Sequence, residues 1–452
     1  MNILIVGCGK IGTTILASLT AEGHDITIIE PDRDVLAEVT NIYDVMGVCG
    51  NGADSDALKE AGVADAELFI AVTGSDELNM LSCFLAKRLG AKHTIARIRN
   101  PEYNDSSLNF LKQELELSMA INPESLAARE LYHILKLPTA AKIETFSRGN
   151  FEMIELRLKD DSPILGVPLS ELRSRYDIKF LICVVQRGDE VYIPDGNFVL
   201  QAGDHIGLTA SPSEIQKLVR ALGLFSKQAK SVMILGGSRT AYYLTRRLLA
   251  SGSDVKIVDK DRTLCEELCL SLPKAVIING DGTHQELLLE EGLQDMDAFV
   301  SLTGIDEQNI LLSFFASAQD VPKVISKVNS PELSAMAERL GLDCVISPRK
   351  IIADVLVRYA RALQNSMGST IETLYSLMDD QVEAIEFLVQ DEPSLVNIPL
   401  KDLQLKSDIL IAGIIRQRKP IIPTGNDAIL PNDRVVLLAA RQHIQELKDI
   451  LK

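Results

Sequence analysis

The sequence of this chain contains one pattern twice. A glycine-rich turn follows the first apolar segment, and a related turn follows 229 residues later: Gly7-Cys8-Gly9-Lys10-Ile11-Gly12 and Gly236-Gly237-Ser238-Arg239-Thr240-Ala241. Further motifs match in the same order at offsets of 229 or 230: Glu30 with Asp259, Gly50-Asn51-Gly52 with Gly280-Asp281-Gly282, Val72-Thr73-Gly74 with Leu302-Thr303-Gly304, and Asn100-Pro101-Glu102 with Ser330-Pro331-Glu332. Because unrelated motifs rarely share one order and one register, we infer a tandem duplication.

The segment after each copy also repeats. Ile193-Pro194-Asp195-Gly196 after the first copy matches Ile422-Pro423-Thr424-Gly425 after the second. Short alternating strands, turn residues and a closing helix, expected at 213–222 and 442–451, predict a small α+β module of roughly 80 residues. We therefore expect four domains, with a polar joint at 226–230 between the halves: 1–138, 139–225, 229–365 and 366–452.

Each long module alternates short apolar segments with amphipathic ones. In the first copy this pattern predicts strands at 1–7, 24–30, 45–48, 68–72, 94–98 and 119–121. Helices are expected between and after them, at 10–22, 32–39, 54–61, 77–89 and 123–137. Such alternation is typical of right-handed βαβ crossovers over a parallel sheet. The predicted fold class is α/β, with two Rossmann-like doubly wound parallel sheets in tandem, each followed by a small α+β domain.

Charge and apolar content argue against several classes of protein. The net charge is −17, whereas nucleic-acid binders usually carry a basic field, so nucleic acid is not an expected partner. No apolar run reaches the roughly 18 residues that span a membrane, and the first residues lack the basic start of a signal peptide. Seven scattered cysteines without a Cys-x-x-Cys pair indicate buried thiols in a reducing cytosol.

The first glycine-rich turn has the spacing of a dinucleotide-binding loop, Gly-x-Gly-x-x-Gly, between a strand and a helix. The first glycine allows the tight turn, the second lets the backbone approach a pyrophosphate, and the third lets the helix pack closely on the strand. The N–H groups of the helix N-terminus would then face the phosphates. The predicted loop comprises Gly7, Cys8, Gly9, Lys10, Ile11 and Gly12.

Residues at the following strand ends complete the predicted first site. Glu30 ends the second strand, where an acid accepts hydrogen bonds from the adenosine ribose hydroxyls and repels the 2′-phosphate of NADP. Asn51 and Gly52 follow the third strand, near the expected adenine, and Thr73 and Gly74 follow the fourth strand. Ligands of open α/β sheets bind at these carboxyl ends.

Basic residues supply candidate phosphate contacts. Arg97 and Arg99 leave the fifth strand, and each could meet a phosphate with bidentate geometry or lie solvated at the surface. We favour Arg97. Lys10, inside the glycine-rich turn, is a further candidate.

The second copy departs from this pattern. Ser238 and Ala241 replace the second and third glycines, and a serine at the second position crowds the approach to a pyrophosphate. Lys327 stands where the first copy has Arg97. We interpret the first site as complete, and expect the second to bind nucleotide more weakly, to bind it in another pose, or to have become structural. The predicted second site comprises Gly236, Asp259, Asp281, Gly282, Thr303 and Lys327.

Enzymatic machinery is missing from the sequence. A dehydrogenase needs a substrate domain and an acid or base near the nicotinamide, but the six histidines are scattered and none lies in a glycine-rich turn. No Walker Gly-Lys-Ser/Thr run is present, so ATP hydrolysis has no visible machinery. We therefore expect no enzyme. The alternative, an NAD-dependent dehydrogenase, would show a substrate-dependent change in NADH absorbance.

The motifs of the first copy resemble the RCK (KTN) domain of potassium-transport regulators. The resemblance rests on the glycine-rich turn with Glu30, on Gly-Asn-Gly-Ala-Asp, on Val-Thr-Gly-Ser-Asp-Glu-Leu-Asn and on Ala-Arg-Ile-Arg-Asn-Pro-Glu-Tyr. The small modules look like the C-terminal domain of the same family. The resemblance implies a cytoplasmic protein that binds NAD or NADH, and in relatives ATP or ADP. It also implies a homo-oligomeric ring, expected to be tetrameric, on the inner face of the membrane under a membrane-embedded Trk-type potassium-translocating subunit.

For mechanism, the resemblance implies a ligand-controlled switch. Different nucleotides would favour different subunit arrangements, with a coupling free energy of about 1–3 kcal/mol, and the ring would pull or relax its partner. The helices that begin at Pro123 and Pro348 are expected hinges or dimer contacts, or ordinary covering helices. An alternative is a sensor of a small anion, an ion or a cyclic dinucleotide in the small modules, with a structural nucleotide.

Overall fold

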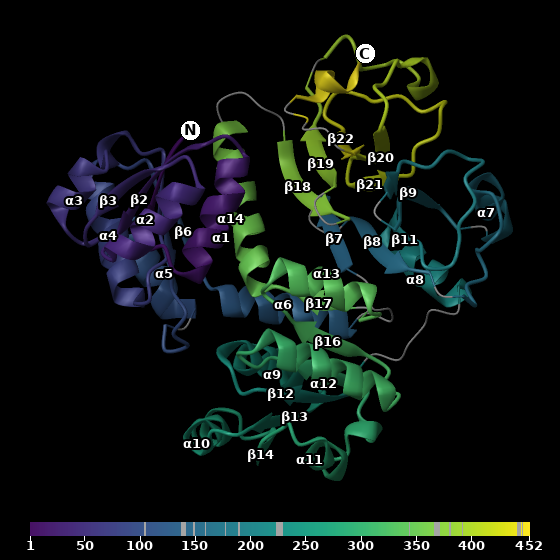
Figure 1. The fold of residues 1–452 in the computed structure, drawn as a ribbon. Coiled ribbons are helices and arrows are strands. Elements are labelled where there is room, and N and C mark those ends of the chain that lie inside the picture. Colours follow the sequence, from purple (N-terminus) through teal and green to yellow (C-terminus); the bar gives the residue numbers. More distant parts are fainter. Residues whose placement is uncertain are drawn as a thin grey trace. The chain divides into compact units, whose positions relative to one another are not determined.

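Both long modules form a six-stranded parallel sheet, which confirms the predicted fold class (Figure 1). In the first module the strand order is β3 (Met46–Cys49), β2 (Asp25–Glu30), β1 (Asn2–Val6), β4 (Leu68–Ala71), β5 (His93–Arg97) and β6 (Met119–Ile121). In the second module it is β14 (Val276–Asn279), β13 (Asp254–Asp259), β12 (Ser231–Leu235), β15 (Ala298–Ser301), β16 (Val324–Lys327) and β17 (Val345–Ile346). The chain changes direction across each sheet between its first and fourth strands, the switch point at which ligands bind in this architecture.

Helices alternate with these strands. In the first module they are α1 (Lys10–Ala21), α2 (Arg33–Ile42), α3 (Ser55–Glu60), α4 (Asp76–Leu89), α5 (Asp105–Glu114) and α6 (Pro123–Lys136), with a 3-10 helix η1 (Val63–Asp65). In the second module they are α9 (Arg239–Ala250), α10 (Arg262–Ser271), α11 (Gln285–Glu290), α12 (Asp306–Ala318), α13 (Pro331–Arg339) and α14 (Pro348–Asn365), with η3 (Leu293–Asp295). The bounds of the expected helices agree with the structure to within a few residues.

Local sequence explains most of these ends. The Asp32 carboxylate accepts hydrogen bonds from the N–H groups of Asp34 and Val35 at 2.9 and 3.3 Å, and so caps α2. Helix α5 was not predicted. Its leucines, Leu108 and Leu111, pack against the module core, so tertiary contacts support a helix that the residue pattern does not announce.

The small modules are antiparallel sheets. The first has the order β10 (Glu190–Tyr192), β9 (Phe180–Arg187), β11 (His205–Ala210), β8 (Phe151–Arg157) and β7 (Lys142–Phe146), with helices α7 (Leu169–Tyr176) and α8 (Pro212–Ala221). The second has the order β18 (Ile371–Leu377), β19 (Val382–Leu388), β22 (Arg434–Ala440), β20 (Ile409–Arg416) and β21 (Lys419–Ile421), with 3-10 helices η4 (Leu400–Asp402) and η5 (Leu447–Ile450).

The predicted closing helices have different outcomes. Helix α8 confirms the first of them. The second, expected at 442–451, is wrong in the described part, which holds only the short η5. Its remaining positions 442, 443 and 445 lie outside the described residues, as does most of the joint expected at 226–230.

The computed structural model describes residues 1–103, 105–136, 142–147, 150–158, 160–176, 178–188, 190–222, 229–342, 344–365, 371–378, 381–390, 392–440, 444 and 446–452. The chain forms two compact units, one of 1–132 with 230–360 and the other of 133–229 with 361–452. Each long module therefore pairs with the other long module, and each small module with the other small module.

Shared packing holds the two small modules together inside the second unit. Phe151 and Met153 of the first belong to one buried cluster with Ala412 and Val436 of the second. The Thr209 hydroxyl donates to the Ala412 carbonyl at 3.0 Å across the same contact.

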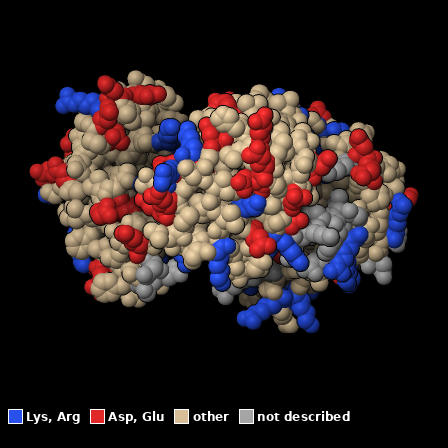
Figure 2. Space-filling view, turned by 90° about the horizontal axis from the view of Figure 1, so that it is seen from below, with Lys and Arg blue, Asp and Glu red and all other residues tan. Residues whose placement is uncertain are grey.

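The charged side chains on the surface reflect the negative net charge of the chain. Across the face drawn in Figure 2, acidic side chains recur over the whole width, and Lys and Arg lie in separate groups between them. In the described part of the chain, no helix has both the length and the apolar character of a membrane span.

Candidate functional site

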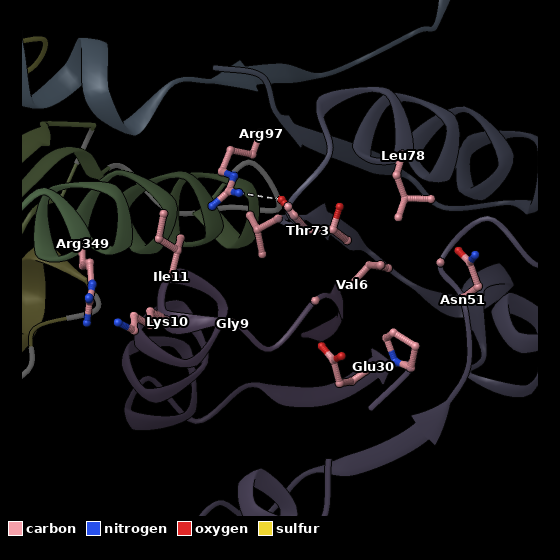
Figure 3. Close-up of a pocket in the computed structure, with 15 residues that line it drawn as sticks. Val6, Gly9, Lys10, Ile11, Glu30, Asn51, Thr73, Leu78, Arg97 and Arg349 are labelled. Atoms are coloured by element: carbon pink, nitrogen blue, oxygen red, sulfur yellow. Dashed lines mark hydrogen bonds between the residues drawn. The ribbon is translucent and has the colours of Figure 1, made fainter. Parts of the chain in front are cut away.

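A cavity of about 600 Å³ lies at the carboxyl ends of the first module's strands (Figure 3). Its volume is within the range of small-molecule sites. Most of the residues predicted for the first site line it, but Cys8 and Gly12 do not. The lining residues are Val6, Gly7, Gly9, Lys10, Ile11, Glu30, Pro31, Asn51, Gly52, Val72, Thr73, Gly74, Leu78, Arg97 and Arg349.

Each glycine of the turn is needed for a different physical reason. Gly7 has φ of +96°, a conformation that side chains disfavour. A Cβ added at Gly12 would lie 2.0 Å from the Gly7 carbonyl oxygen, so α1 approaches the turn more closely than any other residue allows. A Cβ at Gly9 would meet nothing within 4 Å, which leaves open space beside the backbone there.

The N-terminus of α1 has the properties of an anion site. Its N-cap residue is Gly9, and no side chain caps the helix. The N–H groups of the first turn therefore have no side-chain acceptor, and the positive end of the helix dipole lies at the cavity. Such an end binds phosphate groups readily.

Glu30 lines the cavity and also holds the turn. Its carboxylate accepts hydrogen bonds from the Cys8 N–H at 2.7 Å and from the Asp32 N–H at 3.2 Å. Burial and, second, the Glu30 charge raise the pKa of the Cys8 thiol to about 12, so this buried cysteine stays neutral. Sequence reasoning favoured a ribose contact for Glu30, with a helix-capping acid as the alternative, and missed its contact with the loop backbone at Cys8.

A polar network fixes the loop after β4. Asn79, which is fully buried, accepts from the Thr73 N–H at 2.8 Å and from the Thr73 hydroxyl at 2.7 Å, and donates to the Arg97 carbonyl at 2.9 Å. The second module repeats these bonds with Asn309 and Thr303. Asn79 was not predicted as a site residue, although its match with Asn309 at the same offset was a usable signal.

Asp76 joins the same loop to the end of β5. One of its carboxylate oxygens accepts from the N–H groups of Arg99 and Asn100, both at 2.8 Å. Asp306 makes the corresponding bonds in the second module, at 2.8 and 2.9 Å. These acids therefore shape the edge of the cleft in both copies.

Arg97, the last residue of β5, and Arg99, two residues beyond it, differ in position. Arg97 is 6% exposed and donates to the Thr73 carbonyl at 2.6 Å, and its Nε has no hydrogen-bond partner. Burial, followed by the charge of Arg99, lowers the pKa of Arg97. Arg99 donates to the Gly74 carbonyl at 2.7 Å and does not line the cavity. A buried guanidinium with an unused donor fits an anionic group in the cavity.

Charge is divided across the cavity. In Figure 3, Lys10, Arg97 and Arg349 lie on one side, and Glu30 and Asn51 on the other. This division fits a ligand with hydroxyl groups at one end and phosphates nearer the other. The residues present therefore fit a nucleotide.

In the second module, a side chain of the glycine-rich turn caps the helix that follows. The Ser238 hydroxyl accepts from the Ala241 N–H at 3.4 Å and so caps α9, which occupies a donor that is free in the first module. Gly236 keeps the positive φ of Gly7, and the Asp259 carboxylate accepts from the Gly237 N–H at 2.6 Å.

The other residues predicted for the second site make contacts within their own module. Lys327 donates to the Leu302 carbonyl at 3.3 Å, and Asp281 accepts from Thr283. A Cβ at Gly282 would lie 2.2 Å from a Leu235 methyl group, so this glycine serves packing.

Known proteins are similar to this chain along its whole length. The TrkA-N domain family matches residues 3–123 and 232–348, and the TrkA-C domain family matches 153–223 and 384–452. The Trk system potassium uptake protein TrkA homolog of Archaeoglobus fulgidus is 32% identical over 453 residues, covering 100% of both chains. The Trk system potassium uptake protein TrkA of Haemophilus influenzae is 28% identical, covering 100% of this chain and 99% of that protein.

Solved structures share the fold. The GsuK channel bound to NAD matches with a TM-score of 0.64 and 18% identity, covering 97% of this chain and 76% of that chain. The GsuK RCK domain matches with a TM-score of 0.63 and 18% identity, covering 97% and 92%. Because the identity is only 18%, the likeness supports the fold alone, which includes the tandem order of the four modules.

Proposed function

We propose that this chain, which belongs to the TrkA family, is the nucleotide-binding regulatory subunit of a Trk-type potassium uptake system. The observation that carries the proposal is the cavity of the first module. It combines the uncapped N-terminus of α1, the Glu30 carboxylate and the unused donor of Arg97. The role is regulatory and non-enzymatic.

The proposed ligand is NAD or NADH, with ATP or ADP as competing occupants. Glu30 would accept from the ribose hydroxyls beside Asn51, and the first turn of α1 with Arg97 would hold the phosphates. The GsuK channel, which shares this fold, has been solved bound to NAD, and that complex supports the proposed ligand class. The bound nucleotide supplies the signal through its charge and redox state.

The proposed output is control of a membrane-embedded partner. The chain would form a ring, tetrameric in its simplest form, that docks from the cytoplasm on a TrkH-like translocating subunit. Helices α6 and α14 would carry the change between arrangements. The ligand shifts the arrangement only by as much as its affinity differs between the two states.

Calorimetric titration of the full chain with NAD, NADH, ATP, ADP and NADPH tests the nucleotide site. Glu30→Gln removes the charge that the ribose hydroxyls need, so we expect adenine nucleotides to bind at least tenfold more weakly, with less discrimination against NADPH. Glu38→Gln, an exposed position on α2, is the matched control. If the wild-type chain binds none of these ligands, the proposal is wrong.

Docking is tested separately. The full chain and a Trk-type translocating subunit, co-purified with and without NADH or ATP, should associate to a degree that depends on the nucleotide. Equal association under all conditions would contradict nucleotide switching while leaving the site itself intact.

A further inference from the structure

One residue of the second long module reaches the cavity of the first. Arg349, the second residue of α14, lines the cavity, whereas the other lining residues lie between Val6 and Arg97. We propose that Arg349 contacts the phosphates of a nucleotide in this cavity, so that one ligand is held by both long modules. The inference rests on the proposed function, whose ligand it assigns to two modules at once.

The Arg349 side chain makes no competing contact with the residues that the structure describes. Among the residues that the structure describes, neither Arg349 nor Lys10 makes a side-chain hydrogen bond or ion pair. In Figure 3 the nitrogen-bearing ends of both side chains lie on the same side of the cavity. Two cations that face one space without an acid between them are stabilised by an anion there.

Arg97 adds a third positive charge to the same cavity. It is buried, and its Nε is unpartnered. Within the described part of the chain, Glu30 is the single acid that lines the cavity, and it lies on the other side of it. A pyrophosphate or triphosphate therefore matches the cationic side, while the ribose matches Glu30.

The duplication places an arginine at the start of α14 but not at the corresponding start of α6. Arg349 follows the proline that begins α14, and the residue after the proline that begins α6 is Glu124. The two positions that correspond to each other thus carry opposite charges. Burial is the largest cause of the lowered pKa of Lys327 in the second module. The charges of Asp306 and Glu124 raise this pKa, and the charge of Arg349 lowers it. An exchange of the two modules would place an acid where the first cavity has an arginine, and an acid repels phosphate.

This placement makes the phosphates the part of the ligand that both modules recognise. A ligand that contacts Arg349 changes the free energy with which α14 packs beside the first module, whereas adenosine, which has no phosphate, does not. Differential contact of this kind is what couples a ligand to an arrangement.

The test is a ligand series on the full chain with Arg349→Gln. The matched control is Arg262→Gln, because that side chain is 83% exposed and pairs with Glu266 on α10. We expect calorimetry to give at least tenfold weaker binding of ADP, ATP and NAD to Arg349→Gln, less than twofold change for adenosine, and partial rescue by Arg349→Lys.

A second measurement needs no variant. In the wild-type chain, hydrogen exchange of the α14 amides should slow on addition of ADP or NAD and stay unchanged with adenosine. Unchanged exchange with every ligand, or wild-type affinities for Arg349→Gln while Glu30→Gln loses binding, would overturn this inference and leave the proposed function standing. A wild-type chain that binds no nucleotide overturns both.

Discussion

At the scale of single residues, one pair of corresponding positions in the two long modules carries side chains of different charge. His93, at the start of β5, corresponds to Lys323, just before β16. Lys323 is 5% exposed, and burial lowers its pKa to about 8, against an ordinary value of 10.5. A lysine in such a place disfavours the folded state whenever it is protonated.

Replacing Lys323 by Met should therefore change stability in a pH-dependent way. Between about pH 8 and 10.5 the unfolded chain binds more protons at this residue than the folded chain, so its contribution to the free energy of unfolding rises with pH. In urea unfolding, we expect the free energy of unfolding of Lys323→Met to exceed that of the wild type most below pH 8. The two values should converge toward pH 10.5.

The comparison must be a difference between variant and wild type. The buried thiols of Cys8 and Cys83 have raised pKa values, so their contribution falls as pH rises, the opposite sense to that of Lys323. Both chains share those thiols, and the subtraction removes them. A stability difference that does not vary with pH would contradict the assignment to Lys323.

At the scale of secondary-structure elements, the two long modules differ at the N-terminus of the helix that follows the glycine-rich turn. Helices α1 and α9 both follow the glycine-rich turn, but Gly9 leaves α1 uncapped and Ser238 caps α9. The loops after β4 and β15, by contrast, keep the same hydrogen bonds in both modules. The duplication has therefore retained the framework of the cleft and changed the element that would meet the ligand.

Ser238→Gly should restore the first module's arrangement in the second. The change removes the side-chain acceptor of α9, with a stability cost of only a few tenths of a kcal/mol, as is typical for Ser to Gly at an N-cap. We expect calorimetry to detect a second nucleotide-binding event per chain. The wild-type chain, for which we expect one event, is the reference. A variant that still shows one event would mean that other residues, such as Lys327, close the second site.

At the scale of the whole molecule, like modules pair with like. The second unit contains both small modules, and the ring of Phe151 lies where a Cβ at Gly413 would approach it to 2.3 Å. Glycine is therefore required at this contact between β8 and β20, and the shared buried cluster depends on it.

Gly413→Ala should loosen the pairing of the small modules. An added methyl group in a packed contact typically costs about 1–3 kcal/mol, so we expect a lower thermal midpoint by calorimetry. Gly196→Ala is the control, because its Cβ would meet only Ser170, at an ordinary 3.4 Å. Equal midpoints for the two variants would show that the contact does not support the pair.

Much of the site could be anticipated because it rests on local pattern. Sequence alone indicates the glycine spacing, Glu30 at the end of the second strand and Arg97 on the fifth strand, because all of these lie in or beside a predicted strand. The missed residues have other reasons. Asn79 bonds the backbone of the last residue of β5, and Asp76 bonds the backbone just beyond that strand, which periodicity does not show. Helix α5 depends on a core that other segments supply.

The order of residues alone dictates two glycine-rich βαβ sheets, two small antiparallel modules and one complete Gly-x-Gly-x-x-Gly turn, because strand alternation and turn chemistry act between near neighbours. Tertiary structure decides that long modules pair with each other and that Arg349 enters the cavity beside Lys10. Those two residues are far apart in the chain. Their meeting depends on how whole surfaces fit, which no local pattern of residues encodes.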